Sequence, residues 1–225
     1  MSVIYEDRLP DTRFVETVWR TQVRSDGCDV VSADMCWDML IVTQEGKTRV
    51  SIFGPMTRTA HIPHIEGQEW IGIRFKPGTF MPHLSLDKMA NQGIKLPEAT
   101  GKSFWLGSST WECPNYDNVE PFINRLVRGG LLFRDKVVEG VLQGHPQEIS
   151  SRTIQRRFLR VTGLTQRTVR AIERAQQAVS LLRSSMSILD VVYQAGYADQ
   201  QAMTKSLKYL IGQTPAQIAC IRSNE

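Results

Sequence analysis

Seven arginines lie between residues 152 and 174, and one acidic residue, Glu173, stands among them. They follow a helical period, because the apolar Ile154, Phe158 and Val161 recur on one face of a helix. The opposite face carries Arg152, Gln155, Arg156 and Arg160. A folded core does not need so much unpaired positive charge, whereas a phosphate backbone attracts it. The stretch therefore predicts a helix that binds a polyanion.

A second helix of the same kind is predicted in YADQQAMTKSLKYLIG. Its apolar stripe consists of Met203, Leu207, Leu210 and Ile211, and its polar face consists of Gln200, Gln201, Thr204, Lys205 and Lys208. The preceding SILDVVYQAG predicts a short amphipathic helix that ends at Gly196, a residue suited to a left-handed position. Two short helices around a tight glycine-containing turn form a helix-turn-helix.

Residues 150–219, with RTIQRRF, TGL, ERAQQAVSLL, SILDVVYQAGYADQQ and KSLKYLIGQTP, resemble the DNA-binding domain of the AraC/XylS family of bacterial transcription regulators. In that family two helix-turn-helix units are joined by a long helix, and each unit places its second helix in the major groove. The resemblance implies a non-enzymatic cytoplasmic regulator, typically an activator, with double-stranded DNA and RNA polymerase as partners. It also implies a small-molecule effector or a dimer contact in the N-terminal half.

The segment that would join the two units is itself a predicted helix. Residues 166–182 would extend about 25 Å at about 1.5 Å per residue. Two recognition helices at that separation suit successive major-groove faces, which recur about every 34 Å. A last helix is predicted after Thr214 and Gln217, which have capping-box spacing, with Pro215 at the first helical position.

Glutamine and arginine make bidentate contacts with base edges, and short polar or basic side chains commonly bind phosphates. We expect base contacts from Arg152, Gln155 and Arg156 in the first unit and from Gln200, Gln201, Ala202 and Lys205 in the second. We expect phosphate contacts from Ser151, Arg160, Thr204 and Lys208. The family usually has a polar side chain at the position of Ala202, so a contact there would be apolar, for example to a thymine methyl group. The first scaffold helix, predicted over 136–142, is displaced or shortened relative to the family.

The N-terminal region has a different pattern. Alternating runs such as VETVWRTQV, CWDMLIV, TRVSIF and WIGIRF, separated by glycine-containing turns, predict short antiparallel strands. Strands of this size favour a small barrel or sandwich, and the region resembles a short cupin-like domain. A helix is predicted to begin with a capping box at Asp117 and Glu120 and to end at Gly129 and Gly130. All five tryptophans precede residue 112, as strand core or as the lining of an aromatic effector pocket.

These patterns predict an α+β protein with two domains. Residues 1–130 would form the β-rich sensing or dimerisation domain, and residues 131–225 the all-α DNA-binding domain. The chain has 14 basic and 16 acidic residues up to Phe133, and 13 basic and 7 acidic residues after it, so the two parts carry net charges of −2 and +6. The excess of positive charge therefore lies in the part that carries the predicted recognition helices.

The cysteines, the histidines and the lack of long apolar runs bear on functional classes other than a regulator. No signal peptide, membrane span or C-x-x-C spacing is present, so we expect a reduced cytosolic protein with buried cysteines and no cofactor. A cupin-type metal site would use His61, His64, Glu66 and His83. In a strand, however, His61 and His64 would point to opposite faces. We therefore expect that no metal is bound and that the histidines lie in loops or are partly exposed.

Two alternatives to a sequence-specific regulator stay open. One is a metalloenzyme fused to a DNA-binding module, and the other is a non-specific architectural binder, against which the glutamines of the second helix argue. The effector, activation versus repression, and monomer versus homodimer also stay open.

Overall fold

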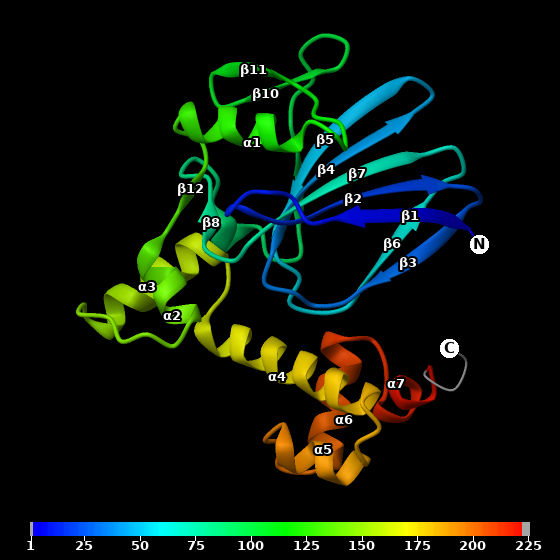
Figure 1. The fold of residues 1–225 in the computed structure, drawn as a ribbon, viewed down its shortest axis with the longest axis vertical. Helices are drawn as coiled ribbons and strands as arrows, with labels where there is room; N and C mark the ends of the chain where they lie inside the picture. The colour runs from blue at the N-terminus through cyan, green and yellow to red at the C-terminus, as the bar shows by residue number, and fades with distance from the viewer. Residues whose placement is uncertain (1, 222–225) are drawn as a thin grey trace. The chain divides into compact units, whose positions relative to one another are not determined.

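The structure, a computed structural model, describes residues 2–221 (Figure 1). Its strands are β1 (Val3–Arg8), β2 (Val15–Val23), β3 (Gly27–Val31), β4 (Trp37–Gln44), β5 (Lys47–Phe53), β6 (Ala60–His64), β7 (Glu69–Phe75), β8 (Thr79–Phe80), β9 (Gly93–Lys95), β10 (Ser103–Leu106), β11 (Ser109–Glu112) and β12 (Phe133–Arg134). Its helices are the 3-10 helix η1 (Leu86–Lys88), α1 (Val119–Arg128), α2 (Lys136–Leu142), α3 (Ser151–Thr162), α4 (Gln166–Arg183), α5 (Ile188–Gln194), α6 (Gln200–Leu210) and α7 (Pro215–Ile221). An antiparallel β-rich N-terminal region followed by a helical C-terminal region confirms the predicted fold class.

Six strands form the main sheet, in the order β1-β2-β7-β4-β5-β9. Every pairing within it is antiparallel. Burial alternates along β4, where Trp37, Met39 and Ile41 face the core, as a strand with one covered face requires. The turn between β4 and β5 has positive φ at both Glu45 and Gly46, which matches the twist of a tight hairpin. The predicted strands of this region are therefore confirmed.

The remaining strands form three small pairs, β10 with β11, β12 with β8, and β3 with β6. Trp37 is buried, and its indole N–H donates to the Thr79 carbonyl at 2.7 Å. Its ring stacks on Phe75 with a centroid separation of 3.8 Å. Trp105, by contrast, is 44% exposed. The tryptophans are therefore not one buried cluster, and Trp37 fits the strand-core interpretation.

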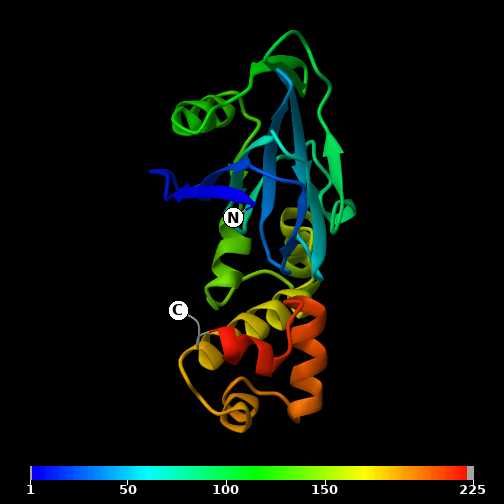
Figure 2. The ribbon, with the colours of Figure 1, turned by 90° about the vertical axis from the view of Figure 1, so that its right-hand side faces the viewer.

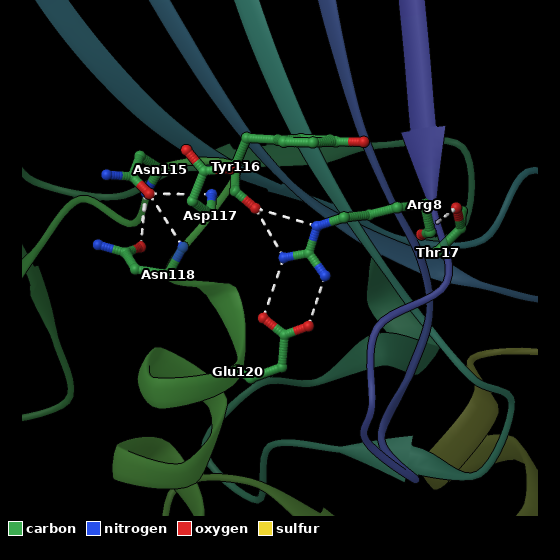
Figure 3. A network of polar contacts seen from close by, with 7 residues as sticks. All are labelled: Arg8, Thr17, Asn115, Tyr116, Asp117, Asn118 and Glu120. Atoms are coloured by element: carbon green, nitrogen blue, oxygen red, sulfur yellow. Dashed lines mark hydrogen bonds and ion pairs between the residues drawn. The ribbon is translucent and has the colours of Figure 1, made fainter.

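Helix α1 begins differently from the prediction (Figure 3). Its N-cap is Asn118, whose side chain makes no capping hydrogen bond, and the Asn115 side chain accepts from the N–H groups of Asp117 and Asn118 at 3.0 and 2.9 Å. Glu120 does not reach back to the helix start. Its two oxygens accept from Nη1 and Nη2 of Arg8 at 2.5 and 2.9 Å. The capping box at Asp117 and Glu120 is wrong, because a bidentate charged pair is stronger than a neutral cap.

Contacts divide the chain into two compact units. The first consists of residues 1–28, 36–55 and 63–165, and the second of residues 29–35, 56–62 and 166–225. Helices α2 and α3 therefore belong to the β-containing unit, and two N-terminal segments belong to the helical unit. The predicted division at residues 130 and 131 does not coincide with these units, and as a boundary between functional domains it stays a prediction.

The helical unit is organised around α4, which α5, α6 and α7 contact (Figure 2). One stripe of α4 is buried, formed by Val169, Ile172, Ala175, Ala178 and Leu182. The predicted linker helix is thus confirmed over the expected residues. Gly196 follows α5 with φ of 70°, the left-handed conformation predicted for it. None of the helices described here is long and apolar enough to cross a membrane.

Candidate nucleic-acid interface

Helix α3 begins and ends at local signals. The Ser150 hydroxyl accepts from the N–H of Thr153 at 3.3 Å, and Gly163 closes the helix at φ of 75°. Phe158 and Val161 are buried on one face. The opposite face is exposed and carries every predicted contact residue of the first unit: Ser151, Arg152, Gln155, Arg156 and Arg160. The helix therefore turns its polar, basic face to solvent, as predicted from its period.

The C-terminal end of α3 packs closely within the β-containing unit. A Cβ atom added at Gly163 would lie 2.6 Å from the carbonyl oxygen of Leu86 in η1, so only glycine permits this approach. The buried Thr162 hydroxyl donates to the Phe158 carbonyl at 2.8 Å and accepts from the N–H of Leu164 at 3.1 Å. The first candidate recognition helix is thus held by the β-containing unit, which its sequence pattern did not indicate.

Helix α2, the predicted scaffold helix, spans the seven expected residues, and residues 143–150 separate it from α3. Its N-cap is the buried Asp135, whose Oδ1 accepts from the N–H groups of Val137 and Val138. Its Oδ2 accepts from Nε of Arg157 on α3 at 2.5 Å. Arg157 therefore has a structural partner, and the expectation of unpaired arginines is wrong at this position.

Helix α6 is the second candidate recognition helix. The Asp199 side chain caps it by accepting from the N–H of Ala202 at 2.7 Å, and Met203, Leu207 and Leu210 are buried. Four predicted contact residues are exposed: Gln200, Gln201, Lys205 and Lys208. Ala202 and Thr204 are half-buried, and the Thr204 hydroxyl donates to the Gln200 carbonyl at 2.8 Å. That hydroxyl must rotate before it can donate to a phosphate, so Thr204 is the weaker of the predicted phosphate ligands on this helix.

The C-terminal end of α6 is bound by the two N-terminal segments of its own unit. The N–H groups of Ala33 and Thr59 donate to the carbonyls of Leu210 and Tyr209 at 2.6 and 2.9 Å. The Ser32 hydroxyl donates to the carbonyl of Ile211 at 3.3 Å. The last carbonyls of a helix lack partners inside the helix. Residues 29–35 and 56–62 supply them here, a role for which the sequence contained no local signal.

The turn before α6 is held by Tyr197. Its hydroxyl lies 3.1 Å from the Ser206 hydroxyl on α6, and the guanidinium of Arg174 on α4 lies 4.6 Å from the centre of its ring. Tyr197 is buried, so these contacts fix the angle at which the chain enters the second helix. Arg174 therefore also has a structural role within the arginine-rich stretch.

The remaining basic residues of α3 and α6 face solvent without internal partners. Within residues 2–221, no hydrogen bond or ion pair engages the side chains of Arg152, Arg156, Arg160, Lys205 or Lys208. Gln155, Gln200 and Gln201 are also exposed. Unpaired cations alternating with amides on one helix face suit phosphates and base edges together.

The histidines do not form a metal site within the described chain. His61 is exposed on β6, whereas His64 on the same strand is only 3% exposed. The expectation of a loop or partly exposed histidine is therefore wrong for His64, because Gly27 leaves space for its ring. Burial lowers the pKa of His83. No group of three His, Cys, Asp or Glu side chains that could hold a metal ion occurs within residues 2–221.

The chain is similar to several known proteins. Residues 148–219 match the family described as a helix-turn-helix domain. The HTH-type transcriptional regulator RipA of Corynebacterium glutamicum is 37% identical over 70 residues, which are 31% of this chain and 21% of that relative. Similar solved structures include apo ToxT K231A from Vibrio cholerae strain SCE256, at 9% identity and a TM-score of 0.42 over 98% of this chain and 97% of that chain. A 1.65 Å structure of ToxT from Vibrio cholerae is 8% identical, with a TM-score of 0.42 over 96% of this chain and 98% of that chain. Residues 148–219 therefore form an AraC-type helix-turn-helix domain, as their motifs predicted.

Proposed function

We propose that the protein is a sequence-specific DNA-binding transcription regulator that reads two half-elements of a duplex with α3 and α6. The observation that carries the proposal is the exposed face of each helix, where unpartnered cations alternate with glutamines. Cations alone would serve non-specific phosphate binding. Glutamine adds bidentate recognition of adenine, which an architectural binder does not need.

Each predicted contact residue receives a role from its chemistry. Arg152, Gln155 and Arg156 contact base edges from α3, and Gln200, Gln201, Ala202 and Lys205 do so from α6. The phosphates are held by Ser151, Arg160, Thr204 and Lys208. Arg157 and Arg174 are left out of these sets, because Asp135 and Tyr197 already engage them.

The proposal includes the partners that a regulator of this family would have. A small-molecule effector binds the N-terminal region, RNA polymerase is contacted at the promoter, and the protein acts in the cytoplasm as a monomer or homodimer without catalysing a reaction.

Selection of bound sequences from a random duplex pool tests the proposal. The 225-residue chain should enrich one motif with two half-elements. Its affinity should then be measured against salt for the selected site and for a scrambled duplex. If α3 and α6 neutralise about six phosphates, log K against log salt should have a slope of about −5.

The selected site should stay bound at a salt concentration that releases the scrambled duplex, because base contacts do not depend on counterion release. Equal affinity for both duplexes across the titration would rule out specific recognition and favour the architectural binder. Metal analysis of the purified protein is the companion measurement for the enzyme alternative. A stoichiometric bound metal would contradict the non-enzymatic regulator.

A further inference from the structure

A cavity of about 290 Å³ lies in the β-containing unit. Its wall is formed by residues before β2, the end of α1, β12 and the first turn of α2. Three cationic side chains line it, Arg13, Arg134 and Lys136, together with one carboxylate, Glu139. The rest of its wall is apolar and includes Phe14 and Phe133. The cavity thus combines a net positive charge with apolar surfaces.

Arg134 is the most buried of these cations, with a side chain that is 15% exposed. Its Nη2 is 2.8 Å from Oε1 of Glu139, and its Nη1 donates to the carbonyl of Arg13. Its Nε is buried and has no hydrogen-bond acceptor within residues 2–221. A buried donor of a charged group without an acceptor is destabilising. The guanidinium therefore retains capacity for one further acceptor.

The size and composition of the cavity limit what could supply that acceptor. Ligand cavities commonly measure about 300–1,000 Å³, so this one suits a small molecule. A carboxylate suits the unpartnered Nε of Arg134, because a hydrogen bond between two charged groups is stronger than one between neutral groups. The aromatic walls favour an apolar body over a strongly hydrated dianion.

We propose that this cavity binds a small monocarboxylic acid with an aromatic or short aliphatic body, and that this acid is the effector. The proposal rests on effector control as part of the proposed function. The carboxylate of the ligand accepts from Arg134, and Arg13 and Lys136 complete the anion site. The apolar body lies against Phe14 and Phe133.

A residue that lines the cavity is the chain neighbour of the residue that positions α3. Asp135 follows Arg134 in the chain, caps α2 and accepts from Arg157 of α3. Glu139, which pairs with Arg134, lies on α2 itself. A carboxylate that competes with Glu139 for Arg134 thus changes the contacts that hold α2. An effector shifts DNA affinity only if it binds the two arrangements of α2 differently.

Calorimetric titration of the 225-residue chain with phenylacetate tests the site, with the neutral phenylacetamide as the matched ligand. The protein should bind phenylacetate at millimolar or lower concentration and should bind the amide at least roughly tenfold more weakly, as expected for the loss of charge-assisted hydrogen bonds. The variant R13Q/K136Q changes only exposed side chains and should weaken phenylacetate by roughly tenfold or more.

The control variant is R49Q. Arg49 is also an exposed arginine, but it lines a different cavity of about 250 Å³ beside β5 and β10. It should leave phenylacetate binding unchanged. Equal binding of acid and amide, no binding of phenylacetate, or equal effects of R49Q and R13Q/K136Q would overturn the site. Binding to the selected duplex distinguishes the two proposals. If the protein binds this duplex specifically but does not bind phenylacetate, the effector site is contradicted and the proposed DNA recognition is not.

Discussion

The carboxylate of Asp135, at the start of α2, pairs with the guanidinium of Arg157 on α3. Its Oδ1 accepts from the N–H groups of Val137 and Val138 at 3.0 and 3.1 Å, which starts α2, and its Oδ2 accepts from Nε of Arg157 on α3 at 2.5 Å. The Asp135 side chain is only 5% exposed, so water does not replace either partner freely. The position of α3 beside α2 therefore depends on one buried carboxylate.

Asp135→Ala should destabilise the protein by more than the loss of a helix cap, which costs about 0.5–2 kcal/mol. Asp135→Asn should cost less, because asparagine still caps a helix but no longer pairs with Arg157 as a charge. Urea unfolding of the two variants and of the unchanged chain measures both losses of stability. Ser150→Ala is the control, since it removes the cap of α3 and a hydrogen bond between exposed hydroxyls but no charged pair. A loss for Asp135→Ala no larger than that for Ser150→Ala would contradict the double role.

Arg156→Ala should relax base preference within one half-element and weaken the selected site by about 1–3 kcal/mol. Arg160→Ala should weaken all duplexes nearly alike, because we assign it to phosphate. Arg157→Ala is the third variant to compare. It should lower the stability of the protein and leave base preference nearly unchanged, since Asp135 holds the Arg157 side chain. Binding to a panel of single-base variants separates the three. The same unchanged preference in all of them would exclude readout by Arg156.

The pair of Arg8 and Glu120 predicts a dependence of stability on pH (Figure 3). The hydrogen bond from Arg8 lowers the pKa of Glu120 below its ordinary value of 4.5 in the folded protein. A lowered pKa stabilises the fold above the ordinary value, and this contribution is lost as pH falls through the folded pKa. Wild type should therefore be more stable than Glu120→Gln near neutral pH, and the difference should disappear in acid.

Urea midpoints measured from neutral to acidic pH give that difference. Glu6→Gln is the control, because Glu6 pairs with Arg20 across 2.6 Å at the surface, where its side chain is 51% exposed. Exposed pairs contribute little to stability. A difference between wild type and Glu120→Gln that stays constant down to acidic pH would contradict the assignment.

Gly212→Ala should be more destabilising than Gly196→Ala. Both glycines have positive φ, 86° and 70°, so each substitution carries the strain of a left-handed residue, roughly 1–2 kcal/mol. A Cβ at Gly196 would meet nothing within 4 Å, whereas one at Gly212 would lie 2.9 Å from Cγ2 of Thr59. The additional loss of stability in Gly212→Ala therefore measures the contact with residues 56–62, which bind the end of α6.

Thr59→Ser removes the Cγ2 atom and keeps the hydroxyl, so it should reduce the additional loss when combined with Gly212→Ala. Thermal unfolding of the single and double variants gives the coupling between them. Equal losses for the two glycine variants, or no coupling between Thr59 and Gly212, would show that residues 56–62 do not bind the end of α6 in solution.

The sequence alone predicted the helices of the DNA-binding region, because their signals are local. The apolar stripes of α4 and α6 repeat every three to four residues, and the capping pair of Thr214 and Gln217 forms as predicted, at 2.8 and 3.2 Å. The exposed faces of α3 and α6 followed from the same period. The main strands followed from their alternation between apolar and polar residues.

The tertiary structure decided which of these elements form one unit. Asp135 and Arg157 are 22 residues apart, Arg8 and Glu120 are 112 apart, and Thr59 and Tyr209 are 150 apart. The partners in each pair have no spacing or motif in common, so no pattern in the sequence connects them. Local periodicity and capping fix a helix within a few residues, whereas the partners that satisfy its ends and its free charges are chosen by packing between surfaces that exist only after the chain has folded.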